Sequence, residues 1–354
     1  MSGTEHALDD VVGERVRRWL IDNDRHPVGD RLRSRLIAGG RSNPTYELTD
    51  GRRFWILRRP PVGHVLPTAH DMGREYRALT ALYGTAVPVP RTVGLCEDAE
   101  LIGASFYVMD RIDGITLRTP EDTGRLTPGQ RRSLSDAAVQ TLVALHEVDP
   151  AAVGLEDWGR PDGYLERQLK RWQRQWESSA TSPRPEVDEL HARLGASMPD
   201  TRFPGIVHGD FKIDNLMVDR DDPTSIRGVL DWEMSTLGDT LADLGILCSF
   251  WDHEGEFFNP ITAGATAMAG FPSRDEIVEA YALARRIDVC DLDWYLVFAD
   301  FKIAVILEGI HARHLQGHTA GADFEGVGEM VGPLLNRALE RAMRAPSPAL
   351  RGLR

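Results

Sequence analysis

One short stretch, VHGDFKIDNLMVD at residues 207–219, constrains the fold more than any other part of the sequence. It places a His, three Asp, a Lys and an Asn among apolar residues. A buried strand does not tolerate charged groups at this density unless they have partners or a function. The apolar runs GIVHG before it and NLMVD after it predict two short strands joined by a tight turn, a hairpin. The stretch is therefore either a polar surface turn or a catalytic loop held between two strands.

Three oxygen-bearing side chains recur at the ends of the predicted strands. Asn215 follows Asp210 by five residues, and Asp231 follows sixteen residues later, at the end of the strand-like run RGVLD. We expect the three side chains to converge where these strands end. Hard oxygen ligands at this density suit Mg²⁺, which completes its shell with phosphate oxygens and water. The pattern therefore favours the catalytic interpretation of the stretch.

The predicted secondary structure changes from mixed to mainly helical near residue 115. The residues before it form a small mixed unit. This unit contains a helical pattern over 7–22, two β-rich runs flanking the turn signal TDGR, a helical pattern over 69–84 and two further strands within 87–114. After it, helical patterns dominate, and SSATSPRPEVD is a connector. The predicted later helices lie in 131–149, 163–178, 241–251, 275–287, 293–315 and 327–343. The chain is thus expected to be α+β, with a small β-rich lobe followed by a large, mainly helical lobe.

Composition excludes some classes of partner. The net charge of −13 supplies no basic field for nucleic acid or an anionic membrane. The N-terminus lacks an apolar signal segment, and no run of about 18 apolar residues could span a membrane. Three widely spaced cysteines favour a reducing compartment, so a cytoplasmic protein is expected. The sequence does not indicate an oligomeric state.

HGDFKIDN resembles the protein-kinase catalytic loop H-R-D-x-x-x-x-N, and LDWE occupies the place of D-F-G. The chain is more similar to the aminoglycoside phosphotransferase family of small-molecule kinases, which has H-G-D and a segment like STLGDTLADLG. Within that family it most resembles the kinase-like domains associated with acyl-CoA dehydrogenases. The motifs GGRSNPTY, ILRRPP, FYVMDRIDG and FKIAVILEGI carry this resemblance, in order, over about residues 30–320. It implies a bilobal protein-kinase-like fold, with an N-terminal helix at 1–29, an N-lobe at 30–112 and a C-lobe at 113–354.

The resemblance also assigns roles in the catalytic stretch. Asp210 would accept the proton of the substrate hydroxyl, and Lys212 would lie near the transferred phosphoryl group. Asn215 and Asp231 would hold Mg²⁺. His208 is expected to be a scaffold residue. Asp239 and Asp243 are expected to cap a helix and brace the catalytic loop.

In the small lobe, Arg58 ends a predicted strand where kinases have a lysine, and Glu75 follows 17 residues later within a helix. The resemblance implies that Arg58, oriented by Glu75, holds the α- and β-phosphates, a task that suits the guanidinium fork. The loop AGGRSNP stands where the glycine-rich loop would be. Its cofactor-binding candidates are Gly39, Gly40, Arg41 and Ser42. Met109, Asp110 and Arg111 would lie in the interlobe hinge, whose backbone pairs with adenine.

The predicted function is an ATP- (or GTP-) and Mg²⁺-dependent transfer of the γ-phosphoryl group to a small-molecule hydroxyl. The acceptor would be a hydroxyacyl-CoA-like metabolite or an aminoglycoside-like compound. Two alternatives stay open: a non-catalytic nucleotide-binding pseudokinase, and a choline- or homoserine-type kinase. The acidic segment WDHEGE at 251–256 is a candidate acceptor-site loop, although aromatic residues such as Trp251 are more often part of a core.

Overall fold

The structure is a computed structural model that describes residues 8–37, 43–61, 71–255, 261–317 and 326–353. The chain divides into two compact units. The first unit comprises Met1–Gly114 and Arg227–Ser235, and the second comprises Ile115–Ile226 and Thr236–Arg354. The fold is a two-lobed, protein-kinase-like α+β fold, as predicted.

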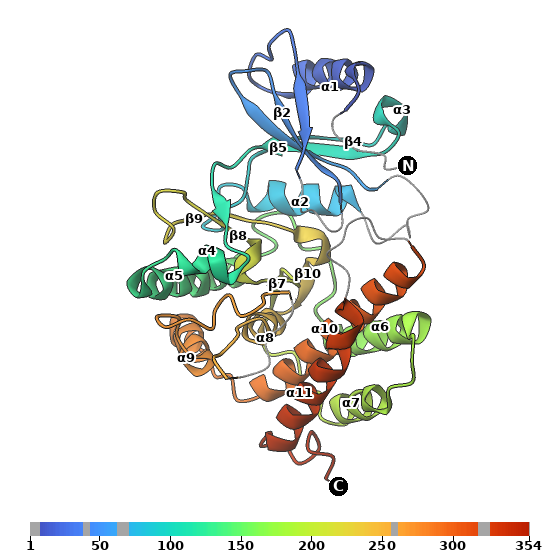
Figure 1. Cartoon of the computed structure of the whole chain (residues 1–354), viewed down its shortest axis with the longest axis vertical. Helices are drawn as coiled ribbons and strands as arrows, with labels where there is room; N and C mark the ends of the chain where they lie inside the picture. Colours follow the sequence, from blue (N-terminus) through green and yellow to red (C-terminus); the bar gives the residue numbers. More distant parts are fainter. Residues whose placement is uncertain (1–7, 38–42, 62–70, 256–260, 318–325, 354) are drawn as a thin grey trace. The chain divides into compact units, whose positions relative to one another are not determined.

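The first unit contains an antiparallel five-stranded sheet in the order β1-β2-β3-β5-β4 (Figure 1). The strands are β1 (Arg33–Leu36), β2 (Thr45–Thr49), β3 (Phe54–Arg58), β4 (Thr92–Cys96) and β5 (Phe106–Asp110). The predicted hairpin at TDGR is confirmed, since β2 pairs with β3 and Gly51 takes the positive φ of the turn. This sheet carries Arg58 at the end of β3.

Two helices of the first unit cover the sheet. Helix α1 (Asp10–Asn23) buries Val16 and Leu20 against a core that includes Trp55 and Leu57. Helix α2 (Met72–Leu82) packs against β4 and β5 and buries Glu75. A short helix, α3 (Ala99–Ile102), was not predicted. It forms because Asp98 caps its start and Gly103 ends it in the left-handed conformation.

The second unit is mainly helical, as predicted. Its helices are α4 (Pro120–Gly124), α5 (Pro128–His146), α6 (Tyr164–Ser179), α7 (Pro185–Ala196), α8 (Leu241–Ser249), α9 (Arg274–Arg285), α10 (Leu292–Leu315) and α11 (Val331–Arg344), with the 3₁₀ turns η1 (Ile213–Asn215) and η3 (Val327–Met330). Helix α10 packs against α6, α7, α8 and α11. Because it is apolar on most sides, it forms the centre of this unit.

The segment predicted as a Ser/Pro connector, 178–188, includes the start of helix α7, which was not predicted. Pro185 occupies its first turn, where the missing N–H costs nothing. Val187, Leu190 and Leu194 are fully buried at helical spacing. The Ser- and Pro-rich residues before Pro185 led to the prediction of a connector, and the apolar residues at helical spacing that follow were not recognised as a helix.

The predicted hairpin around residues 207–219 is wrong. Strand β7 (Pro204–Val207) pairs with β10 (Thr236–Asp239), whereas β8 (Leu216–Val218) pairs with β6 (Ile115–Thr116). The residues between β7 and β8 are too many for a tight turn, and their backbone bonds elsewhere: the N–H groups of His208 and Gly209 donate to the side chain of Asp243. The polar stretch therefore crosses from one small sheet to another. Strand β9 (Ile226–Val229) is present, as predicted.

Gly245 allows α8 to approach α10 closely. A Cβ at this position would lie 2.7 Å from the carbonyl oxygen of Tyr295. We expect Gly245→Ala to lower the free energy of unfolding by about 1–3 kcal/mol, because a backbone carbonyl cannot move aside without shifting the helix. Urea unfolding measures this change.

Gly129→Ala is the matched control for this prediction. Gly129 lies in the first turn of α5, and an added Cβ there meets nothing within 4 Å. This variant should be unchanged or more stable by up to about 1 kcal/mol, since alanine favours a helix over glycine. Equal stabilities for the two variants would contradict the close approach of the two helices.

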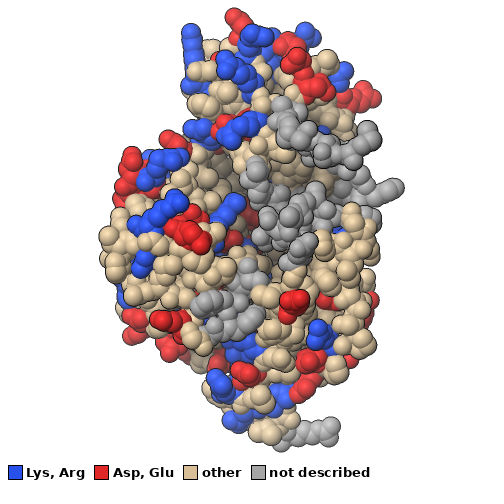
Figure 2. Space-filling model, in the orientation of Figure 1, with Lys and Arg blue, Asp and Glu red and all other residues tan. Residues whose placement is uncertain are grey.

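Charged side chains of both signs are interspersed over the described surface of the face shown in Figure 2. This view offers no broad basic area among the described residues, in keeping with the net charge of −13. Among the helices that the structure describes, none combines the length and the apolar character needed to cross a bilayer.

Candidate active site

The loop after β7 brings together three of the predicted site residues. The Oδ2 atom of Asp210 lies 3.0 Å from Nζ of Lys212 and accepts a hydrogen bond from Nδ2 of Asn215 at 2.9 Å. Nδ2 also donates to the backbone oxygen of Asp210 at 2.8 Å. The Asp210 side chain remains 22% exposed. Its carboxylate is therefore held in one orientation and still open to a small molecule.

Lys212 lies in a largely buried setting rather than on a solvated face. Its Nζ lies 3.8 Å from Oδ2 of Asp214 and 4.7 Å from the centre of the Phe250 ring. Burial raises the pKa of Asp214, although Lys212 acts in the opposite direction. Lys212 thus places a positive charge directly beside Asp210, where an anionic phosphoryl group would be stabilised.

A buried network supports the backbone of this loop. Asp243, in α8, accepts hydrogen bonds from the N–H groups of His208 (2.6 Å) and Gly209 (2.7 Å). Gly209 has φ +85°, which favours glycine. His208 is buried, and its Nδ1 accepts from the N–H of Asp210 at 3.2 Å. The predicted scaffold role of His208 and the bracing role of Asp243 are both confirmed. The predicted helix cap is wrong for Asp243, which lies inside α8, where Thr240 is the N-cap.

His146, at the end of α5, completes this network. Its Nε2 lies 3.2 Å from Asp243 and its Nδ1 lies 2.7 Å from the Tyr281 hydroxyl. Burial lowers the pKa of His146, although Asp243 acts in the opposite direction. A neutral imidazole can donate from Nε2 to Asp243 and accept the Tyr281 hydroxyl at Nδ1.

The first unit contains the ion pair predicted between Arg58 and Glu75. Nη1 of Arg58 lies 3.0 Å from Oε2 of Glu75. The Tyr107 hydroxyl donates to the same oxygen at 2.7 Å, and Nδ2 of Asn43 donates to Oε1 at 3.2 Å. Burial opposes the charge on Arg58, but Tyr107 and Glu75 outweigh this effect and raise the Arg58 pKa. Arg58 is thus a permanent, oriented cation.

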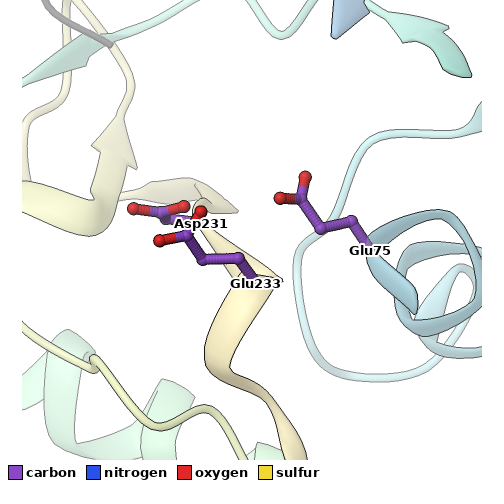
Figure 3. Close-up of side chains that lie close together, drawn as sticks. All are labelled: Glu75, Asp231 and Glu233. Atoms are coloured by element: carbon purple, nitrogen blue, oxygen red, sulfur yellow. The ribbon is translucent and has the colours of Figure 1, made fainter. Parts of the chain in front are cut away.

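Glu75 is also one of three carboxylates that lie close together in the first unit (Figure 3). Glu75 reaches from α2 toward Asp231 and Glu233, and one oxygen from each of the three lies within 4.8 Å of the others. Glu233 lies in the 3₁₀ turn η2 (Trp232–Met234), and its Oε2 accepts from Nδ2 of Asn43. Nη2 of Arg58 lies 3.6 Å from Oδ1 of Asp231.

This oxygen-only cluster fits a hard divalent cation. Oδ1 of Asp231 is buried and accepts no hydrogen bond from the described residues. Asp231 also has φ +66°, an uncommon conformation for a residue other than glycine, which is often found at functional sites. Because Glu75 is already paired with Arg58, the carboxylates of Asp231 and Glu233 supply the excess of negative charge. Such a donor set suits Mg²⁺.

The two predicted metal ligands lie in different units of the chain. Asn215 belongs to the second unit and Asp231 to the first, so joint ligation of one metal by these two stays a prediction. In Asn215 the amide nitrogen is used by Asp210, which leaves the amide oxygen as the atom that could ligate. Gly39, Gly40, Arg41 and Ser42 lie outside the described residues.

Met109 and Asp110 end β5, and Arg111 follows. The N–H groups of Asp110 and Arg111 donate to the backbone oxygens of Arg91 and Phe54. The side chain of Asp110 pairs with Arg91, while that of Arg111 pairs with Glu47. The predicted pairing of this segment with adenine stays a prediction, and it would have to use carbonyl oxygens or the residues that follow.

The segment 251–256 begins in the core. Trp251 is buried and donates its indole N–H to the backbone of Pro272. Asp252 is also buried, and its Oδ2 accepts from Thr262 and Gly264. These two residues brace a loop, and a contact between the segment and the acceptor stays a prediction. Glu256 and the phenylalanines at 257 and 258 lie outside the described residues.

Sequence reasoning missed three residues of these sites. Asn43 bridges Glu75 and Glu233, and Tyr107 holds Glu75. Neither carries a signal beyond its place in a motif. Lys302 is different: it is a single lysine within the apolar run FADFKIAVIL of α10, and a charge so placed needs a buried partner.

The fold is that of a two-lobed, kinase-like protein. Residues 33–277 match the phosphotransferase enzyme family, and the chain belongs to that family. It is 34% identical to acyl-CoA dehydrogenase family member 11 of Gallus gallus over 96% of this chain, and 34% identical to family member 10 of Mus musculus over 86%. The chain spans only 44% and 29% of the length of these relatives.

Solved structures agree with this assignment. A crystal structure described as a candidate aminoglycoside phosphotransferase from Ralstonia eutropha is 32% identical, with a TM-score of 0.82, over 94% of this chain and 99% of that one. An aminoglycoside phosphotransferase complex with ADP and hygromycin B shares the fold at 14% identity and a TM-score of 0.56, over 91% and 98% of the two chains. The predicted resemblance is thus confirmed.

Proposed function

We propose that this protein transfers the γ-phosphoryl group of ATP, or of GTP, to a hydroxyl of a small molecule. The observation that carries this proposal is the geometry at Asp210. Its carboxylate is oriented by Lys212 and Asn215 and remains partly exposed, as a group that receives a hydroxyl proton must be. A family of phosphotransferases, with solved members bound to ADP or GDP, provides the chemical context.

Each residue would contribute positioning or charge. Asp210 would orient the acceptor hydroxyl and take its proton late in the transfer. Lys212 would stabilise the negative charge of the phosphoryl group. Arg58, oriented by Glu75, would hold the α- and β-phosphates in the place of the kinase lysine. Asn215 and Asp231 would hold Mg²⁺, which when bound neutralises phosphate charge.

For the acceptor, we propose a hydroxyacyl-CoA-like metabolite. This choice rests on the relatives described as acyl-CoA dehydrogenase family members, which share a third of their residues with most of this chain. The alternative is an aminoglycoside-like compound, because distant members of the fold are complexes with hygromycin B or kanamycin. Those structures are 13–14% identical and support the fold alone.

A transfer assay tests the function. Purified protein with Mg²⁺ and γ-labelled ATP or GTP should move the label to at least one member of a panel of hydroxyacyl-CoAs, aminoglycosides, choline and homoserine. A parallel thermal-shift measurement with nucleotide and Mg²⁺ identifies binding without transfer. Stabilisation without label transfer to any acceptor would favour the non-catalytic nucleotide-binding alternative. Absence of both would overturn the proposal.

A further inference from the structure

Lys302 is a buried lysine of α10 that lies next to the catalytic loop. Its residue is 6% exposed. Its Nζ donates a hydrogen bond to the backbone oxygen of Gly209 at 2.5 Å, and it also lies 5.5 Å from the centre of the Trp172 ring. A buried ammonium is costly without a partner, so the position of this lysine requires an explanation.

The peptide groups around Gly209 are held from two helices. The N–H of Gly209 donates to Asp243 of α8, and its carbonyl oxygen accepts from Lys302 of α10. Because Gly209 directly precedes Asp210, these two bonds determine the direction in which the chain enters Asp210. A displacement here would move the Asp210 carboxylate as well.

The charged groups around Lys302 come from three elements. Asp210 of the loop and Asp243 of α8 favour its protonated form, whereas Arg171 of α6 and Lys212 of the loop disfavour it. Burial has the largest effect and lowers the pKa of Lys302 to about 8. The ammonium form thus predominates near pH 7 and is lost as the pH rises through about 8.

We propose that Lys302 is a positioning residue for phosphoryl transfer: it holds the carbonyl of Gly209 and places a buried positive charge next to the residue that precedes Asp210. This inference rests on the proposed function for its kinetic consequence, and on the geometry alone for its structural one. Nothing in the proposed transfer requires Lys302 to touch the nucleotide or the acceptor.

Lys302→Met removes the charge and keeps the length of the side chain. We expect kcat to fall by about 10- to 100-fold, since a small misplacement of a reacting group has effects of this size. The KM for nucleotide should be unchanged. In the wild type, kcat should also fall as the pH rises through about 8, when Lys302 loses its proton. That step should be absent in Lys302→Met and in Lys302→Arg, whose guanidinium does not titrate there.

Glu308→Gln is the matched control. Glu308 is another buried charged residue of α10, and it accepts hydrogen bonds from Thr181 rather than from the catalytic loop. This variant should keep the wild-type kcat and pH profile even if its stability changes. If Lys302→Met also kept both, the kinetic part of the proposal would be wrong.

Backbone hydrogen exchange tests the proposal without an acceptor. The amides of 208–210 should exchange about tenfold faster in Lys302→Met than in the wild type, and be unchanged in Glu308→Gln. Faster exchange with no phosphoryl transfer by the wild type would overturn the proposed function but support the positioning role. Unchanged exchange in Lys302→Met would overturn the positioning role whatever the activity.

Discussion

Replacing Asp210 with Asn should lower kcat by about 10²- to 10⁴-fold, the range that a positioned acid or base contributes. The amide has the same size as the carboxylate and can still accept hydrogen bonds from Lys212 and Asn215, but it cannot take the acceptor's proton. Binding of nucleotide with Mg²⁺ should remain close to that of the wild type. Steady-state kinetics and a nucleotide titration measure the two effects separately.

Asp219→Asn is the control for this change. Asp219 belongs to the same polar stretch, but its Oδ1 accepts from the N–H groups of Asp221 and Asp222 in the turn after β8. The same loss of one carboxylate charge should leave kcat within about twofold there, since a substitution that keeps a surface turn has little effect. Near-wild-type turnover by Asp210→Asn would show that the proton goes elsewhere.

Asp231→Asn should reduce the affinity for Mg²⁺–nucleotide by more than about 100-fold, the upper range for partners that only support a metal ligand. The fold should be kept, because Asn adopts the positive φ of this position as readily as Asp. Thermal shift with nucleotide at increasing Mg²⁺ concentration measures the loss. The free protein should unfold at nearly the wild-type temperature.

Glu233→Gln separates a metal ligand from a general effect of negative charge. Glu233 belongs to the same carboxylate cluster but already accepts a hydrogen bond from Asn43. Glu233→Gln should therefore reduce the affinity for Mg²⁺–nucleotide less than Asp231→Asn does. Equal losses in the two variants would indicate that the cluster acts through its total charge, and unaltered Mg²⁺ dependence in Asp231→Asn would remove Asp231 from the metal site.

The order of motifs was enough to predict the class of fold and the local group of Asp210, Lys212 and Asn215. These three residues lie within one short stretch, so local spacing constrains their geometry. The Arg58–Glu75 pair was also predictable, because a strand end and the following helix bring them together. In both cases the information is short-range or carried by a recurring motif.

Strand pairing was not predictable in the same way. Strand β7 pairs with β10, about thirty residues away in sequence, and β8 pairs with β6, about a hundred residues before it. Where no turn signal such as TDGR joins two strands, local pattern shows that a strand exists but not which strand pairs with it. For the same reason the contact of Lys302 could not be predicted, because its partner Gly209 lies 93 residues earlier in the chain.

The division of the chain has a consequence for exchanging its parts with those of relatives. The first unit includes Arg227–Ser235, a segment that interrupts the sequence of the second unit. Asp231 and Glu233 lie in this segment and therefore belong to the first unit. A single recombination crossover after Gly114 would therefore set Arg58 and Glu75 of one parent against Asp231 and Glu233 of another. Functional chimeras should require two further crossovers, around this nine-residue segment, and the acidic segment is expected to be inherited together with the arginine it faces.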